Sequence, residues 1–190
     1  MLKGKFKVLA IKENIDLVPW ADAIYGCDAA WWRHRLHTPV VRDFKGPKVC
    51  WSGNGLGIQD GVLQVNLAPA KQGTGLFYSE DLDFGTGRIG GGGNSGFQAL
   101  NLAINWGARK IVLIGYDMHD LYGKHWYGTN RWPLANNPDS SCFNRWKPAF
   151  DRAALACEAK GIQVLNASKG SALNCFKKVS LEEAVKICTN

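Results

Sequence analysis

Residues 90–95, GGGGNS, carry the clearest chemical signal in this chain. Glycine tolerates positive φ and lets another molecule come close to the backbone. Asn94 or Ser95 can cap a helix that follows, so that its first N–H groups face the turn. Bare amides at the positive end of a helix dipole favour an anion, above all phosphate. The segment therefore predicts phosphate contacts from Gly91, Gly92, Gly93, Asn94 and Ser95; the alternative is a glycine connector without a ligand.

A second group of chemically capable side chains lies in the polar and aromatic segment 119–145. A connection of this length without regular structure is more often functional than a spacer. Lys124 and Arg131 would add positive charge, Arg131 through a planar fork that grips two oxygens. Trp126 or Tyr127 could stack on a base or ribose. The segment predicts the remaining contacts to a nucleotide.

His125 is the candidate catalytic residue, within the sequence GKHWYG. An imidazole pKa can be tuned near neutrality, so His125 suits a general base or a phosphate partner. A structural hydrogen bond is the alternative role.

The elements that must position these residues alternate between strands and helices. Strands are expected at 6–11, 23–27, 48–51, 62–67, 111–114 and 162–165, and helices at 29–36, 97–107, 146–160 and after the capping box of Ser180 and Glu183. Strands alternating with helices imply right-handed βαβ crossovers. The sequence predicts an α/β fold, a single Rossmann-like three-layer domain over 1–190 with a mainly parallel sheet.

In such sheets, ligands bind outside the carboxyl ends of the strands. Asp28, Asp117 and Asn166 each follow an expected strand. This rule therefore brings these three residues together with the glycine turn and the 119–145 segment. For Asp117, capping of a neighbouring turn is the alternative.

Two of the eight tryptophans, Trp31 and Trp32, are adjacent. A helix cannot bury two neighbouring residues on one apolar stripe. One of the two rings is expected to line a groove or contact a partner, with core packing at the end of an element as the alternative.

The composition narrows the function classes. A hydrophobic content of 46% with 21% charged residues is ordinary for a soluble globular protein, and the net charge of +7 favours anionic ligands. The sequence contains no basic block that indicates nucleic-acid binding. The six cysteines form no C-x-x-C pair, so neither a metal nor a cofactor is expected. With no signal peptide or membrane-length apolar run, a cytoplasmic protein is predicted, and a homo-oligomer is left open.

The segments GGNSGFQALNLAINWGARKIVLIGYDM, HWYG and GIQVLNASKGSALNCF, with PWADAIYGCDAAWW upstream, carry a family resemblance. The chain resembles a group of uncharacterised tailed-phage proteins. These are similar to the bacterial sialyltransferases with a single Rossmann-like domain and to DUF115-type proteins. The resemblance covers most of the chain and implies a location in the host cell cytoplasm.

The sialyltransferases bind a cytidine nucleotide-sugar and use a histidine of the long loop as a base. The resemblance assigns this role to His125 and phosphate contacts to Tyr122 and Tyr127. Such proteins usually have a G-x-G-P-S-L phosphate turn before the segment that matches VLAIKENIDLVPW, and this chain starts after that point. The turn is therefore expected to be missing, or replaced by SGNGLG at 52–57.

These features lead to a primary function and two alternatives. The first is binding of a small phosphorylated nucleotide-derived ligand without turnover, with sequestration of a host nucleotide signal as its use. The second is a glycosyltransferase or hydrolase acting on a nucleotide-sugar. The third is a structural phage component that has kept the fold and lost the pocket.

Overall fold

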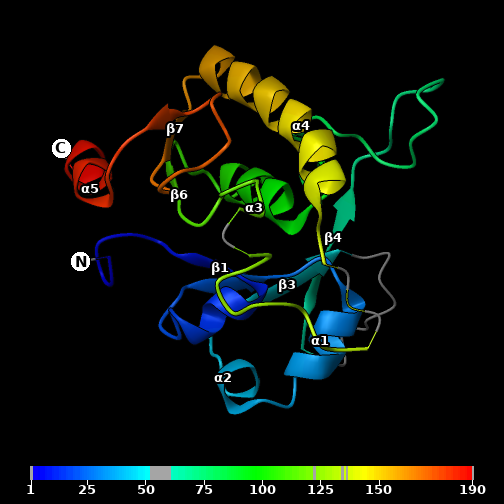
Figure 1. Cartoon of the computed structure of the whole chain (residues 1–190), viewed down its shortest axis with the longest axis vertical. Coiled ribbons are helices and arrows are strands. Elements are labelled where there is room, and N and C mark those ends of the chain that lie inside the picture. The colour runs from blue at the N-terminus through cyan, green and yellow to red at the C-terminus, as the bar shows by residue number, and fades with distance from the viewer. Residues whose placement is uncertain (1, 52–60, 122, 134, 136, 190) are drawn as a thin grey trace.

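A computed structural model describes residues 2–51, 61–121, 123–133, 135 and 137–189. Five parallel strands form one sheet in the spatial order β1 (Leu9–Ile11), β2 (Ala23–Tyr25), β3 (Lys48–Trp51), β4 (Leu63–Leu67) and β5 (Arg88–Ile89) (Figure 1). A second parallel sheet contains β6 (Lys110–Leu113), β7 (Gln163–Asn166) and β8 (Lys177–Lys178). The predicted α/β class with mainly parallel sheets is confirmed.

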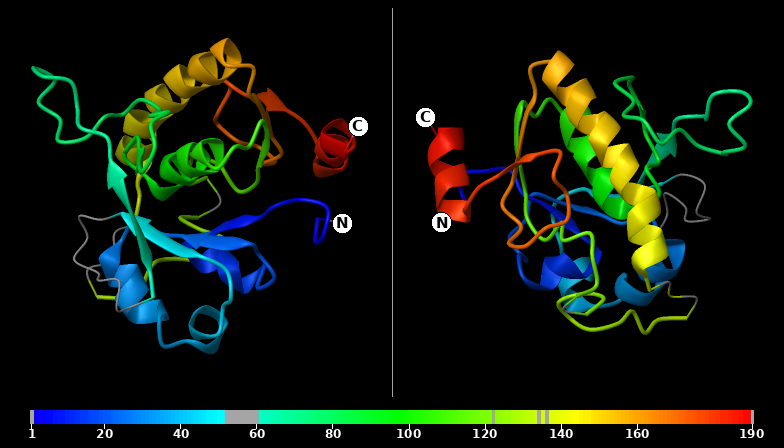
Figure 2. Two further views of the ribbon diagram at one scale, coloured as in Figure 1. Left: turned by 180° about the vertical axis from the view of Figure 1, so that it is seen from behind. Right: turned by 45° about the horizontal axis from the view of Figure 1, so that its top comes forward.

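Helices cover both faces of the five-stranded sheet. The helices of the described chain are the 3-10 helix η1 (Lys12–Asp16) and the α-helices α1 (Ala29–Arg35), α2 (Pro39–Arg42), α3 (Ser95–Asn105), α4 (Ser140–Ala159) and α5 (Leu181–Thr189). Helices α1 and α2 lie on one side of the sheet, while α3 lies on the other with α4 beyond it (Figures 1 and 2). The three-layer expectation therefore describes this part of the molecule.

Strands β2 and β3 of the large sheet carry buried apolar residues on both faces, because both faces are covered there. Ile24 and Cys50 pack on the side of α1, whereas Tyr25 and Val49 pack against α3. Successive residues of a strand point to opposite faces, which explains this alternation. The continuous apolar runs of these strands in the sequence are therefore explained by the helices that cover both faces of the sheet.

Helix α3 is buried on two sides. Asn94 caps its start by accepting a hydrogen bond from the Phe97 amide at 2.9 Å. Ala99 and Leu102 pack on the large sheet, while Phe97 and Leu100 join the cluster formed with α4, β6 and β7. The predicted cap and helix are confirmed.

The structure departs from the predicted elements at α4, which starts at Ser140 and not at residue 146. Asp139 accepts a hydrogen bond from the Cys142 amide at 3.0 Å, a cap signal that the sequence contains. Pro148 lies inside the helix, and the prediction placed it near the helix start. The elements η1, α2, β5 and β8 were not predicted because each is too short to show a periodic pattern.

The two adjacent tryptophans correct another expectation, since neither of them lines a groove. Trp31 and Trp32 are both 0% exposed, and their rings meet edge to face at 4.7 Å. The Trp31 indole donates to Glu13 at 3.1 Å and the Trp32 indole to the Gly26 carbonyl at 2.8 Å. A short helix covered by both η1 and the sheet offers two directions of burial, so the single-stripe argument does not apply.

Candidate functional site

The carboxyl ends of β1 and β2 meet the start of α3, and polar side chains gather there. Lys12 follows β1 and forms an ion pair with Asp28, which follows β2. The Ser95 hydroxyl, in the first turn of α3, donates to the Cys27 thiol at 3.0 Å. Burial lowers the pKa of His125 and the charge of Lys12 adds to this effect, so we count His125 with this group on electrostatic grounds. We call Lys12, Cys27, Asp28, Ser95 and His125 the strand-end cluster.

Lys12 is held in an uncommon conformation at the centre of this cluster. Its φ of +50° lies in the left-handed region, which non-glycine residues rarely adopt. Burial opposes the charge on Lys12, but the neighbouring Cys27, Asp28 and Glu13 raise its pKa above the usual value. The ammonium group therefore remains charged at neutral pH.

The side chain of Asp28 forms an ion pair where a helix-capping hydrogen bond would be usual. It occupies the N-cap position of α1 with an extended backbone, where an aspartate normally accepts from the amides of the first helical turn. Its side chain makes no such capping bond and contacts Lys12 instead. The ion pair with Lys12 therefore leaves the first turn of α1 without a side-chain cap from Asp28.

His125 is fixed by its own loop. Its ring stacks on Tyr127 at 4.9 Å, and its Nε2 lies 3.3 Å from the Asn130 side-chain nitrogen. Asn130 accepts from the Tyr127 hydroxyl at 2.7 Å, which orients its amide so that the nitrogen donates to His125. Burial, then Lys12 and Lys124, lower the pKa of His125, so the ring is neutral at neutral pH. Because Nε2 faces the Asn130 nitrogen, we assign the proton of the neutral ring to Nδ1.

A cavity of about 330 Å³ opens beside the cluster, and we call it the loop cavity. The 119–145 segment contributes Trp126, Tyr127, Arg131 and Trp132 to its wall, while η1 and α1 supply the opposite wall. Tyr127 belongs to the wall and also stacks on His125, so the cavity and the cluster are adjacent. The volume falls in the range of small-molecule sites.

The wall contributed by η1 and α1 carries two carboxylates and one guanidinium group, so its charges are only partly balanced. Arg35 is paired with Glu13 at 2.6 Å and with Asp16 at 2.5 Å, and its side chain is 13% exposed. His34 lies over Trp132 with the ring centroids 6.1 Å apart. Because both carboxylates are engaged by Arg35, they repel an anionic ligand less than free carboxylates would.

Trp126 and Arg131 give the loop cavity its binding character. Trp126 is 57% exposed, and its indole N–H donates to Asn14 at 2.8 Å, which ties the loop to η1. Arg131 is exposed and lines the cavity without an acidic partner among the ion pairs of the described residues. The cavity therefore offers an aromatic face and a guanidinium group to a ligand.

In the glycine turn, residues 90–95, the first two amides are engaged within the protein. The Gly90 amide donates to Asn101 at 2.7 Å and the Gly91 amide to the Ser79 carbonyl at 2.7 Å. A Cβ on Gly92 would lie 2.1 Å from the Phe97 ring. A Cβ on Gly93 would lie 2.5 Å from the Trp146 ring. Close internal packing explains these glycines, and the amide of Gly91 is not available to a phosphate.

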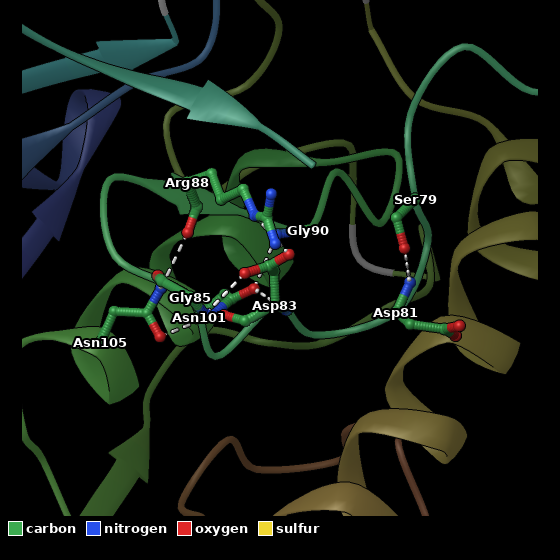
Figure 3. Close-up of polar contacts among 8 residues, drawn as sticks. All are labelled: Ser79, Asp81, Asp83, Gly85, Arg88, Gly90, Asn101 and Asn105. Carbon is green, nitrogen blue, oxygen red and sulfur yellow. Dashed lines mark hydrogen bonds and ion pairs between the residues drawn. The ribbon is translucent and has the colours of Figure 1, made fainter. Parts of the chain in front are cut away.

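Figure 3 shows how α3 holds the segment that precedes this turn. The Asn101 side-chain oxygen accepts from the Asp83 amide at 2.8 Å as well as from Gly90, and its nitrogen donates to the Asp83 carbonyl at 2.8 Å. Asn105 donates to the Arg88 carbonyl at 2.8 Å. The fully buried Asn101 is thus a structural latch.

Three other predicted site residues, Asn166, Asp117 and Lys124, belong neither to the strand-end cluster nor to the lining of the loop cavity. Asn166 is buried, donates to the Ser171 hydroxyl at 2.9 Å and accepts from the Ser168 amide at 3.0 Å, so it organises a turn. Asp117 is exposed, and its backbone carbonyl accepts from Ala172. Lys124 forms an ion pair with Asp120 at 2.9 Å. Of the predicted ligand-binding set, Asp28 and Ser95 join the cluster, and Trp126, Tyr127 and Arg131 line the cavity.

Sequence reasoning missed the contributions of η1 and α1. Lys12 directly follows the first strand, so the rule that ligands bind at carboxyl ends could have identified it. Arg35 and Glu13 gave no such signal, because their pairing depends on how η1 packs against α1. Tyr122 and the 52–57 segment lie outside the described residues.

Within the described residues, no three metal-ligating side chains cluster, and no helix has the length and apolar character needed to cross a bilayer. Comparison of this chain with family models, curated proteins and solved structures gives no significant match.

Proposed function

We propose that this protein binds a small phosphorylated, nucleotide-derived ligand in the loop cavity and does not turn it over. One observation carries the proposal: an exposed tryptophan and an exposed arginine line a cavity of about 330 Å³ beside a cluster that contains Lys12. The aromatic rings suit a base, and the cations suit phosphate oxygens. Given the resemblance to tailed-phage proteins, we propose that the ligand is a nucleotide signal of the host.

Binding without turnover is supported by the state of His125. Its Nε2 lone pair accepts from Asn130, and Nδ1 carries the proton of the neutral ring. Neither nitrogen is free to remove a proton from a substrate in this conformation.

The test begins with the purified protein. Heating releases bound molecules, and mass spectrometry identifies them; incubation with a panel of nucleotides and cyclic dinucleotides, followed by the same extraction, extends the test. We expect an intact phosphorylated nucleotide. Altered products would overturn the absence of turnover, and failure of every nucleotide to bind would overturn the proposal as a whole.

A matched pair of tryptophan variants locates the site. Trp126→Ala removes the exposed ring of the cavity, and Trp106→Ala removes a ring that is 52% exposed at the end of α3. Loss of base stacking costs about 1–3 kcal/mol, so nucleotide affinity falls roughly tenfold or more in the first variant only. Equal affinities in the two variants would exclude the loop cavity.

A glycosyltransferase or hydrolase acting on a nucleotide-sugar is the second candidate. It is favoured by the lowered pKa of His125, which burial, Lys12 and Lys124 produce, because a base must be unprotonated at working pH. Rotation of Asn130 away from His125 would then free Nε2. His125→Ala distinguishes the two functions: lost turnover with retained binding identifies an enzyme, whereas unchanged turnover removes His125 from any mechanism.

A further inference from the structure

The Lys12–Asp28 ion pair lies beside the loop cavity, yet the sequence-based site contained only its acidic member. Lys12 is the first residue of η1 and directly precedes Glu13, which lines the cavity. Burial, then Glu13 and Asp28, raise the pKa of Tyr127, which lines the same cavity. The ion pair and the cavity wall therefore share one electrostatic environment.

We propose that Asp28 holds the place of a ligand phosphate, and that an anionic ligand displaces it from Lys12. This inference rests on the proposed function. The carboxylate of Asp28 contacts the ammonium group in the same way as a phosphate oxygen would. Ligand binding would thus be an exchange of one anion for another on Lys12.

The geometry of Asp28 gives the displaced carboxylate a destination. Asp28 already has the extended backbone of an N-cap residue, with φ of −93° and ψ of 120°, and its side chain leaves the capping position unused. A side-chain rotation brings the carboxylate to the amides of Ala30 or Trp31 in the first turn of α1. The released charge is stabilised there, so displacement does not leave Asp28 without a partner.

The accessibility of the pair fits an exchange and not a permanent structural bridge. The Lys12 side chain is 20% exposed and that of Asp28 is 45% exposed, whereas the Arg35–Glu13 pair of the cavity wall is 13% and 10% exposed. Water and small anions can reach the first pair. The second pair is enclosed and keeps its carboxylate fixed.

Inorganic pyrophosphate tests the exchange of anions on Lys12 by itself, because it carries phosphate groups and no nucleobase. Its affinity is measured by calorimetry at constant salt for the wild type, Asp28→Asn, Lys12→Met and Lys12→Arg. Because Asp28 competes with pyrophosphate for the ammonium group of Lys12, removing the carboxylate should raise pyrophosphate affinity about tenfold, and removing the ammonium should lower it about tenfold. Lys12→Arg should retain most of the wild-type affinity.

Asp22→Asn is the matched control, because it removes the same charge at the opposite end of β2 and breaks an exposed pair with Lys7. We expect it to change pyrophosphate affinity much less than Asp28→Asn does. If both variants gained the same pyrophosphate affinity, the gain would come from the change in net charge alone, and the proposal would be overturned.

Nuclear magnetic resonance of the wild type supplies an independent readout. Addition of pyrophosphate should shift the backbone amide signals of Ala30 and Trp31 as Asp28 moves to the cap. Pyrophosphate binding with unchanged amide signals, or no pyrophosphate binding by any variant, would overturn the exchange. Nucleotide binding that depends on Trp126 would still stand in either case, so the proposed function fails only by its own test.

Discussion

The glycine turn and the loop cavity make opposite uses of polar and aromatic residues. In the turn, Asn101 and Ser79 accept hydrogen bonds from the first glycine amides, and Phe97 and Trp146 fill the space that a Cβ would need. In the cavity, Trp126 and Arg131 remain exposed. A glycine run can therefore be required by internal packing or by contact with a ligand. The hydrogen-bond partners of its amides distinguish these two roles.

The largest expected effect on stability comes from Asn101, the buried residue that holds the glycine turn. Asn101→Ala leaves the part-buried amide of Asp83 and the buried amide of Gly90 without an acceptor, and each such group costs about 1–3 kcal/mol. We expect the free energy of unfolding to fall by about 3 kcal/mol in urea titrations. Asn105→Ala is the control and should cost about 1 kcal/mol, because its acceptors lie nearer to solvent. Similar losses in both variants would show that Asn101 has no special role.

A pair of glycine substitutions sharpens the same comparison. Gly92→Ala places a methyl group against the Phe97 ring and strains a φ of +54°, which should destabilise the protein by roughly 2 kcal/mol. Gly128→Ala, in the loop of the cavity, meets open space at a φ of +96° and should cost about 1 kcal/mol from backbone strain alone. Thermal unfolding measures both. A harmless Gly92→Ala would contradict the packed turn.

Arg131 tests the open region. Arg131→Met removes the cavity guanidinium and should weaken nucleotide binding about tenfold, the equivalent of about 1.4 kcal/mol, with little change in stability. Arg145→Met, on the exposed side of α4, is the control. If both substitutions weaken binding equally, general charge and not the cavity attracts the ligand.

The smallest effect is the pH dependence that His125 contributes. Burial, Lys12 and Lys124 place its pKa below 6.5 in the folded state, so the unfolded chain takes up the proton first as pH falls. The stability contribution of His125 is present above pH 6.5 and is lost as pH falls through the lower pKa of the folded state. Urea titrations at several pH values should show a shallower acid loss for His125→Gln.

The fold was largely predictable because its signals are local. Apolar runs predicted most of the strands, and Asn94, Ser180 and Gly107 marked helix ends that the structure confirms. The hydroxyl of Ser180 accepts from the Glu183 amide at 3.1 Å, as the capping box predicts. The missed elements are two to five residues long, too short for a periodic pattern to show in the sequence.

The site was predictable only in part, because its decisive contacts are long-range. The residues after β2 and in the 119–145 segment were identified from strand ends and from composition. The partner of Gly90 is Asn101, a residue inside the following helix, and no local pattern identifies an asparagine that reaches back to a turn. Likewise, Lys12 becomes part of the site through Asp28, sixteen residues away.

The central claim is that the ligand occupies the loop cavity and not the glycine turn. Hydrogen–deuterium exchange tests it most directly, with the nucleotide that gives the largest thermal shift in the panel. We predict that this nucleotide protects amides in 125–132 and 12–16 and leaves exchange in 90–94 unchanged. Protection confined to 90–94 would contradict the account and return the phosphate to the glycine turn.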